Sequence, residues 1–313
     1  MDLKNRIKII QRALARWGLY GSYWLLSRSP YKAVASITRV FIAIGFRLTS
    51  RQRRLAKESL KIAFGDTKNE KEIDDIVRQN FFNLGQGMVE MLYFLSHPEL
   101  VKHRVVFYGR EHLDQALKEG KGIIAVTAHF GNFPLMMLSC TQSGYPTNVI
   151  VRPARDSKLE QFLFNSRTKA GLNTIYAAPR KQCVENTLKA LRNNEIVFIP
   201  MDQNFGGDGG IFVDFFGQKA ATATGPVVFA QRTKASIIPM FIIREHEDYH
   251  KIFIEPPVVL EERENEKEAI VLNVSKITQI IEQYVRRYPH EWGWMHRRWK
   301  SRPQETEPVS TSV

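Results

Sequence analysis

One histidine follows a predicted strand directly, at a position where a side chain that transfers protons could reach a substrate. His129 comes just after the apolar run Ile123–Thr127, which predicts a strand buried on both faces of a parallel sheet. The turn 131–132 follows, with Asn132 as candidate N-cap and Pro134 in the first turn of an apolar helix. Imidazole suits proton transfer near neutral pH, and such corners bind ligands in α/β sheets. The pattern predicts a general base, with a structural histidine at a strand end as the alternative.

Two more polar groups follow other predicted strands. Arg152 comes after the strand predicted at Thr147–Val151, and Asp202 and Gln203 come after the one predicted at 196–201. Because the carboxyl ends of parallel strands meet at one edge of the sheet, His129, Arg152 and Asp202 are expected to lie near one another. Taken singly, Arg152 fits a surface ion pair and Asp202 fits a turn cap. Together the three favour an active site.

Several other chemistries find no support in the sequence. Cysteine and histidine occur nowhere at zinc-ligand spacing, no Gly-x-Ser-x-Gly elbow is present, and the two cysteines are far apart. The glycine-rich segment 204–210 lacks the Lys-Ser/Thr ending of a phosphate-binding P-loop. We therefore expect no metal, and we interpret 204–210 as a mobile loop beside the active site.

The elements that must position these residues follow from the hydrophobic periodicity. Amphipathic helices are predicted at 3–26, 51–64 and 70–95. From residue 105 onward, short apolar runs alternate with helical patterns, which indicates βαβ units and a mostly parallel sheet flanked by helices. The strands are predicted at 122–128, 147–151, 174–177, 196–201, 237–243 and 250–254, and the helices at 134–143, 157–170, 182–193, 226–234 and 269–288.

The amino-terminal region combines positive charge with aromatic residues. The net charge of +13 requires anionic neighbours, and the first sixty residues hold many of the cations. The predicted helix 3–26 carries Trp17 and Trp24 among basic residues, a pattern typical of helices at a membrane interface. The apolar stretches are too short to span a bilayer. We expect membrane contact without a span; the alternative is a helix packed on the protein's own core with a solvated basic face.

Five ordered sequence blocks resemble the lipid A biosynthesis acyltransferase family of the lysophospholipid acyltransferase superfamily. The blocks are AHFGNFP, VRPARD, PMDQNFGGDGGIFVDFFG, ATGP and WGWMHRRWK. The resemblance implies a glycerolipid acyltransferase-like α/β fold and transfer of an acyl chain to a hydroxyl of a glycolipid such as a lipid A precursor. It implies an acyl carrier protein or coenzyme A thioester as donor, anionic membrane lipids as neighbours and no separate cofactor. The expected location is the cytoplasmic face of the inner membrane, as a peripheral or monotopic protein.

The family's catalytic motif is a histidine followed five positions later by an acid, and this chain has Pro134 at that position. The imidazolium formed during proton transfer therefore needs another partner. Asp202 is the first candidate because it follows another strand end, and Glu90 on the preceding helix is the second. The backbone N–H groups of Gly131 and Asn132 are expected to hold the oxyanion, with Arg152 binding phosphate or supplying positive charge.

Other residues are expected to contact substrate. The resemblance places the family's lipid-site segment at Phe215, Phe216 and Gly217, for which an ordinary strand and turn is the alternative. Gln203 is assigned to substrate binding as the neighbour of Asp202. Near the carboxyl end, Arg297 and Arg298 stand among tryptophans, which suits a lipid interface; a helix whose aromatics pack on the core is the alternative.

The expected organisation is an interfacial helical region at 1–100, an acyltransferase domain at 101–303 and a disordered tail at 304–313. A second functional hypothesis is a noncatalytic lipid-binding protein of the same fold, suggested by Pro134. A nucleic-acid binder, suggested by charge alone, is disfavoured because no recognition motif occurs and the amino-terminal cations accompany Trp and Tyr.

Overall fold

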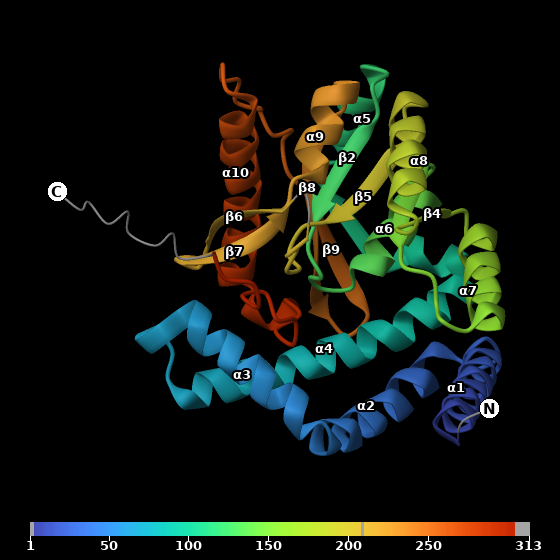
Figure 1. Ribbon diagram of the computed structural model, residues 1–313. Coiled ribbons are helices and arrows are strands. Elements are labelled where there is room, and N and C mark those ends of the chain that lie inside the picture. The colour runs from blue at the N-terminus through green and yellow to red at the C-terminus, as the bar shows by residue number, and fades with distance from the viewer. Residues whose placement is uncertain (1–2, 208–209, 304–313) are drawn as a thin grey trace.

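A mixed sheet with helices on both faces forms the centre of the protein (Figure 1). The structure is a computed structural model that describes residues 3–207 and 210–303, so the predicted tail at 304–313 lies outside the described residues. In this part of the chain a seven-stranded sheet has the order β1-β9-β8-β2-β5-β3-β4. The predicted α/β class is confirmed.

The six predicted apolar runs each form a strand, and three further described strands, at 105–108, 210–215 and 218–223, were not among those predicted. Their bounds are β1 Val105–Tyr108, β2 Ile123–Thr127, β3 Thr147–Val151, β4 Asn173–Tyr176, β5 Ile196–Pro200, β6 Gly210–Phe215, β7 Gln218–Ala223, β8 Ser236–His246 and β9 Tyr249–Ile254. Strands β8, β2, β5, β3 and β4 are parallel to one another. β9 is antiparallel to β8, and β1 is parallel to β9, so the sheet is mostly but not wholly parallel. β6 and β7 form a separate antiparallel hairpin.

Ten helices surround the sheet within the described residues. Their bounds are α1 Leu3–Leu26, α2 Tyr31–Leu48, α3 Ser50–Phe64, α4 Glu70–Ser96, α5 Arg110–Lys118, α6 Phe133–Gln142, α7 Ser157–Lys169, α8 Arg180–Arg192, α9 Gly225–Thr233 and α10 Glu266–Arg287. Short 3₁₀ turns occur at Gly65–Thr67, Pro98–His103 and Pro289–Glu291.

The central strand β2 is buried on both faces, as its unbroken apolar sequence predicts. Ile124 and Val126 join the core cluster shared with α8, α9 and α10, whereas Ile123 and Ala125 join the one shared with α5 and α6. This alternation is the period-2 geometry of a strand. The strand that precedes His129 is therefore packed on both faces.

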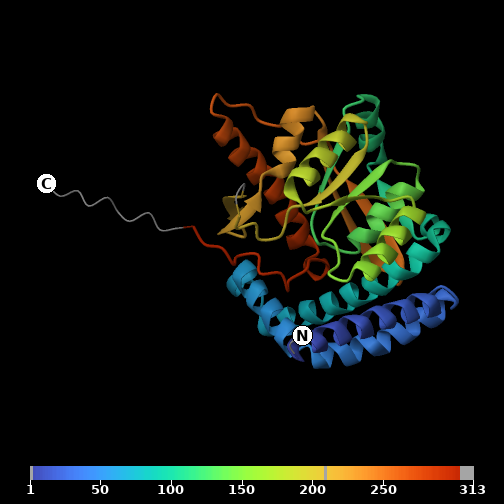
Figure 2. The same cartoon turned by 45° about the vertical axis from the view of Figure 1, so that its right-hand side comes forward.

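Helices α2, α3 and α4 lie across one end of the sheet, and α1 lies beside α7 at one end of this helical layer (Figures 1 and 2). On α1, Tyr20 and Tyr23 pack on Phe162 of α7, while Trp17 and Trp24 are more than half exposed. One side of α1 therefore packs on the protein's own core, whereas its two tryptophans face outward. None of the described helices alone has the length and hydropathy of a membrane span; α2 and the segment Ser50–Thr67 reach it only together, with an 80° bend between them.

Candidate active site

The backbone around His129 is held by a carboxyl-terminal segment far away in the sequence. Gly293 donates its N–H to the His129 carbonyl at 3.0 Å, and Gly131 donates its N–H to the Glu291 carbonyl at 2.8 Å. The turn also lies tight against β8, because a Cβ on Gly131 would meet the Ile242 carbonyl oxygen at 2.1 Å. The φ of Gly131 is +56°, which glycine adopts at little cost. The corner is thus fixed from two sides.

The imidazole of His129 contacts a buried carboxylate at the end of the neighbouring strand. Nδ1 lies 2.8 Å from Oδ1 of Asp202, whose side chain is fully buried at the end of β5. Because an ionised carboxylate only accepts hydrogen bonds, Nδ1 carries the proton and Nε2 keeps its lone pair. The other oxygen of Asp202 accepts the indole N–H of Trp292 at 2.8 Å. Asp202 thereby holds the ring in the tautomer that a general base requires.

The two groups shift each other's pKa in opposite directions. Burial of the imidazole disfavours its charged form, but the hydrogen bond and charge of Asp202 outweigh burial and raise the pKa of His129 above its ordinary value. Burial likewise opposes ionisation of Asp202, yet the hydrogen bond and charge of His129 hold the pKa of that carboxyl below its usual range. The pair therefore favours an ionised carboxylate beside an imidazole that gains a proton readily.

The free side of the ring faces an accessible, polar surrounding. About a quarter of the His129 side chain is exposed, and Nε2 lies 3.2 Å from Nε2 of Gln203. The ring of His296 lies edge-on at 4.9 Å between centroids, and that of Phe133 at 5.1 Å. A hydroxyl that takes the place of Gln203 could give its proton to Nε2. The arrangement fits general-base catalysis of attack by an alcohol.

Comparison with known proteins shows the family of the chain. Residues 1–301 match the family model described as bacterial lipid A biosynthesis acyltransferase. The chain belongs to this family. It is 26% identical to a lipid A biosynthesis lauroyltransferase of Escherichia coli K12 over 296 residues, covering 92% of both chains. It is 25% identical to a lipid A biosynthesis palmitoleoyltransferase of the same strain over 295 residues, covering 92% of this chain and 91% of the relative. A phosphatidylinositol mannoside acyltransferase of Mycobacterium tuberculosis is 26% identical over 148 residues, 46% of each chain.

In this acyltransferase the acid beside the histidine does not come from the family motif, five positions after the histidine. It comes from the end of another strand. Pro134 occupies the first turn of α6, where its fixed φ suits the helix start. Asp202 of β5 contacts His129 instead, in agreement with the first candidate drawn from the sequence. Glu90, the second candidate, lies 1% exposed on α4 and binds Arg244 and Asn132 rather than His129.

Arg152 lies on the expected edge of the sheet, at the carboxyl end of β3. It directly follows β3, which pairs with β5. Its side chain is exposed, and among the described residues it forms no hydrogen bond or ion pair with His129. Arg297 is likewise exposed, so both arginines remain available to an anionic ligand.

Arg298 differs from the expectation that it binds substrate. Its side chain is fully buried, and its guanidinium donates to the carbonyls of Gln203 at 3.1 Å and Ala221 at 2.6 Å and to the hydroxyl of Thr222. Burial lowers the pKa of Arg298 to about 10. The cation braces the segment that carries Asp202, because backbone carbonyls are the partners that satisfy it there.

The aromatic residues assigned to lipid contact also lie inside the protein. Phe215 and Phe216 are 1% and 5% exposed, and Phe215 packs against Trp292 and Trp299. These side chains pack in the core, within the strand and turn that the alternative describes, and they present little surface to a lipid. Their assignment to substrate binding stays a prediction. Gly217, which is exposed, closes the hairpin with a φ of +69°.

The expected oxyanion donors are only partly free, since the N–H of Gly131 is engaged by Glu291. The predicted glycine-rich loop is described only at 204–207 and 210, and its start is tied down by hydrogen bonds between Asn204 and Ser301. The donation of Trp292 to Asp202 was not foreseen from the sequence, which marked this tryptophan only as part of an aromatic cluster.

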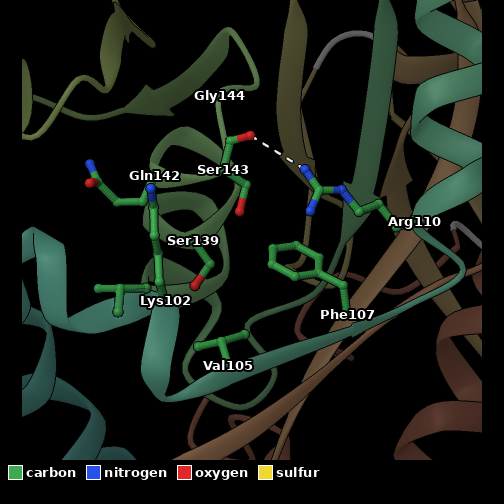
Figure 3. Close-up of a pocket in the computed structure, with 9 residues that line it drawn as sticks. Lys102, Val105, Phe107, Arg110, Ser139, Gln142, Ser143 and Gly144 are labelled. Carbon is green, nitrogen blue, oxygen red and sulfur yellow. Dashed lines mark hydrogen bonds between the residues drawn. The ribbon is translucent and has the colours of Figure 1, made fainter.

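A cavity of about 570 Å³ lies away from this centre (Figure 3). It lies beside the carboxyl end of α6, whereas His129 precedes the amino end of that helix. Arg110 at its edge donates to the Ser143 carbonyl at 3.4 Å and to the hydroxyl of Tyr145 at 2.8 Å. Since its lining shares no residue with the surroundings of His129, we assign it no part in acyl transfer.

Proposed function

We propose that this acyltransferase moves a fatty acyl chain from an acyl carrier protein or coenzyme A thioester to a hydroxyl of a lipid A precursor, with His129 as general base. The observation that carries the proposal is the 2.8 Å contact between Nδ1 of His129 and the buried carboxylate of Asp202. The contact supplies the counter-charge and tautomer control that Pro134 cannot supply.

In the proposed reaction, Nε2 of His129 takes the proton of the acceptor hydroxyl while its oxygen bonds to the thioester carbonyl carbon. The tetrahedral oxyanion then collapses, the carbon–sulfur bond breaks, and the imidazolium returns its proton to the departing thiolate. No covalent enzyme intermediate is needed. Because the N–H of Gly131 is engaged, we assign oxyanion stabilisation to the N–H of Asn132 and the side-chain amide of Gln203.

Membrane contact is part of the proposal. Large apolar side chains stand exposed along α1, α2 and α4, including Trp17, Phe41, Leu48 and Met88. Of these, Phe41 and Met88 line an apolar groove of about 430 Å³ between the three helices. A patch of this kind on a basic region suits an anionic bilayer surface, and we place it at the cytoplasmic face of the inner membrane.

The direct test is an in vitro transfer assay with purified protein, a lipid A precursor in mixed micelles, and acyl carrier protein and coenzyme A thioesters as separate donors. We expect the glycolipid to gain the mass of one acyl group with at least one donor. A folded protein that binds the glycolipid but consumes neither thioester would overturn the proposal and favour the noncatalytic relative suggested by Pro134.

A further inference from the structure

The carboxylate of Glu90 gathers five polar side chains, which come from α2, α4, β8, β9 and the turn before α6. Arg244 of β8 donates to this carboxylate from its two terminal guanidinium nitrogens, each at 2.7 Å. The hydroxyl of Tyr31 at the start of α2 donates to it at 3.0 Å. Gln86 donates at 3.1 Å, and the buried His250 ring lies 3.7 Å away. The fifth contact comes from the active-site turn: the side-chain amide of Asn132 donates to Oε2 at 2.9 Å.

Asn132 connects this cluster to the catalytic corner. Its other side-chain atom, Oδ1, accepts the N–H of Leu135 at 3.3 Å and thereby caps α6. One amide group therefore faces Glu90 with its nitrogen and the helix start with its oxygen. Asn132 is 5% exposed, and it follows His129 by three residues. Its backbone orientation decides where its N–H, a proposed oxyanion donor, points.

Arg244 also connects the Glu90 cluster to Glu291, which binds the same turn. Its backbone N–H donates to the Glu291 carboxylate at 3.1 Å, and the Glu291 carbonyl accepts the N–H of Gly131 at 2.8 Å. Asn132 is thus held by the Glu90 carboxylate and Gly131 by the Glu291 backbone carbonyl, and Arg244 contacts both of these glutamates. None of these contacts touches His129 itself, so the cluster acts on the turn and not on the base.

We propose that Glu90 is a positioning residue that orients the 131–132 turn through Asn132, so that the turn's free N–H meets the developing oxyanion. This inference rests on the proposed function and adds a residue to it. A buried, bidentate Arg–carboxylate pair makes a rigid anchor, because moving it would leave charges unpaired away from water. The anchor orients Asn132 through a hydrogen bond, in the way that carboxylates behind metal-binding histidines orient those ligands in other proteins.

The first test separates the anchor from the helix cap. Asn132→Ser keeps an oxygen that caps α6 but removes the nitrogen that binds Glu90. We expect kcat to fall roughly 100-fold, as a small misplacement of a catalytic group can cause, with KM and the acid limb of the pH profile unchanged. Gln86→Met is the matched control: it removes another donor to the same carboxylate but leaves Asn132 in place, so we expect wild-type kcat.

A second pair of variants guards against a mere folding defect. Asn132→Asp places two carboxylates in contact, and Glu90→Gln leaves Arg244 without its counter-charge, so each alone is expected to lose activity and stability. Combined, they restore one hydrogen bond with donor and acceptor exchanged and one negative charge in the cluster. We expect the double variant to be about tenfold more active than either single variant.

Hydrogen exchange supplies a readout that does not depend on chemistry. Peptides that cover 128–135 are expected to exchange faster in Asn132→Ser than in the wild type or in Gln86→Met. Unchanged kcat and exchange in Asn132→Ser, or a double variant no better than its single parents, would overturn the positioning role. If the wild type itself transfers no acyl group, the proposed function fails, and the exchange measurement still decides whether Glu90 orders the turn.

Discussion

Trp292 donates its indole N–H to Oδ2 of Asp202 at 2.8 Å, and the other oxygen of the same carboxylate faces His129. A fully buried tryptophan thus satisfies the half of the carboxylate that the base does not use. The relationship helps to explain how a buried acid stays ionised beside the imidazole, because both of its oxygens have a donor.

Removing that donor tests its contribution. Trp292→Phe keeps an aromatic ring in the core but leaves Oδ2 of Asp202 without its hydrogen bond. We expect a loss of about 1 to 3 kcal/mol in the free energy of unfolding, measured in urea, and a smaller kcat. Trp294→Phe, whose indole donates instead to the Pro289 carbonyl, is the control that should retain kcat. Equal kcat in both variants would count against the role of Trp292 at the site.

The carboxylate itself should matter much more for catalysis. Asp202→Asn puts an amide donor beside Nδ1, which drives the ring proton to Nε2 and removes the lone pair that accepts the substrate proton. We expect kcat to fall about 10³-fold or more with little change in KM. The exposed Asp75→Asn on α4 serves as control. Turnover within a few-fold of the wild type in Asp202→Asn would assign the acid's role elsewhere.

The pH profile should reflect the same pair. His129 must be neutral to accept a proton, and Asp202 raises the pKa of His129 above its ordinary value of 6.5 against the effect of burial. Activity is therefore present above that pKa and lost as pH falls through it. We predict that kcat/KM decreases on the acid side with a midpoint above pH 6.5. A midpoint at or below pH 6.5 would show that Asp202 does not raise the pKa of His129.

Stability at acid pH should depend on another histidine. Burial lowers the pKa of His250 to about 4, although the charge of Glu90 opposes the shift. The unfolded chain then binds a proton at this site between about pH 6.5 and 4 while the folded chain does not, so stability falls as pH is lowered through that window. The effect amounts to about 3 kcal/mol. Urea unfolding at several pH values should show a shallower acid loss for His250→Gln than for the wild type; equal slopes would contradict this.

The membrane-facing patch can be tested without touching the site. Phe41 and Leu48 on α2 are 67% and 79% exposed, so replacing each by Ser should cost the fold little. We expect binding to anionic vesicles to weaken roughly tenfold per substitution, measured by sedimentation. Val259→Ser is a matched control, since that side chain is 77% exposed in the segment after β9. Unchanged binding in both α2 variants would place the membrane contact on another surface.

Much of the fold follows from local patterns along the chain. The buried run of β2, the N-cap at Asn132 and the amphipathic helices at both ends appear in the structure within a few residues of their predicted bounds. Asp202 could be predicted as the partner of His129 because two strand ends of a parallel sheet share an edge. The pairing of Asp202 with His129 follows from the parallel arrangement of the strands and does not require knowledge of side-chain conformations.

What the sequence could not reveal depends on contacts between distant segments. Arg298 lies in a run of basic residues typical of a surface, yet it is buried because the hairpin and residue 203 offer carbonyls to its guanidinium. Phe216 points inward because the hairpin turn packs on α10, where the Glu282 side chain accepts the Phe216 N–H at 2.6 Å. Neither contact leaves a signature in the spacing of residues, since each partner lies dozens of positions away.

The most direct measurement of the central claim is single-turnover acyl transfer by the wild type and by His129→Gln, whose amide side chain is not a base and cannot take up the substrate proton at neutral pH. We first verify that the two proteins bind the thioester and the glycolipid with equal affinity and have equal free energies of unfolding in urea. We predict that the variant forms acylated glycolipid at least about 10²-fold more slowly. Equal rates in the two proteins would contradict the assignment of His129 as the base.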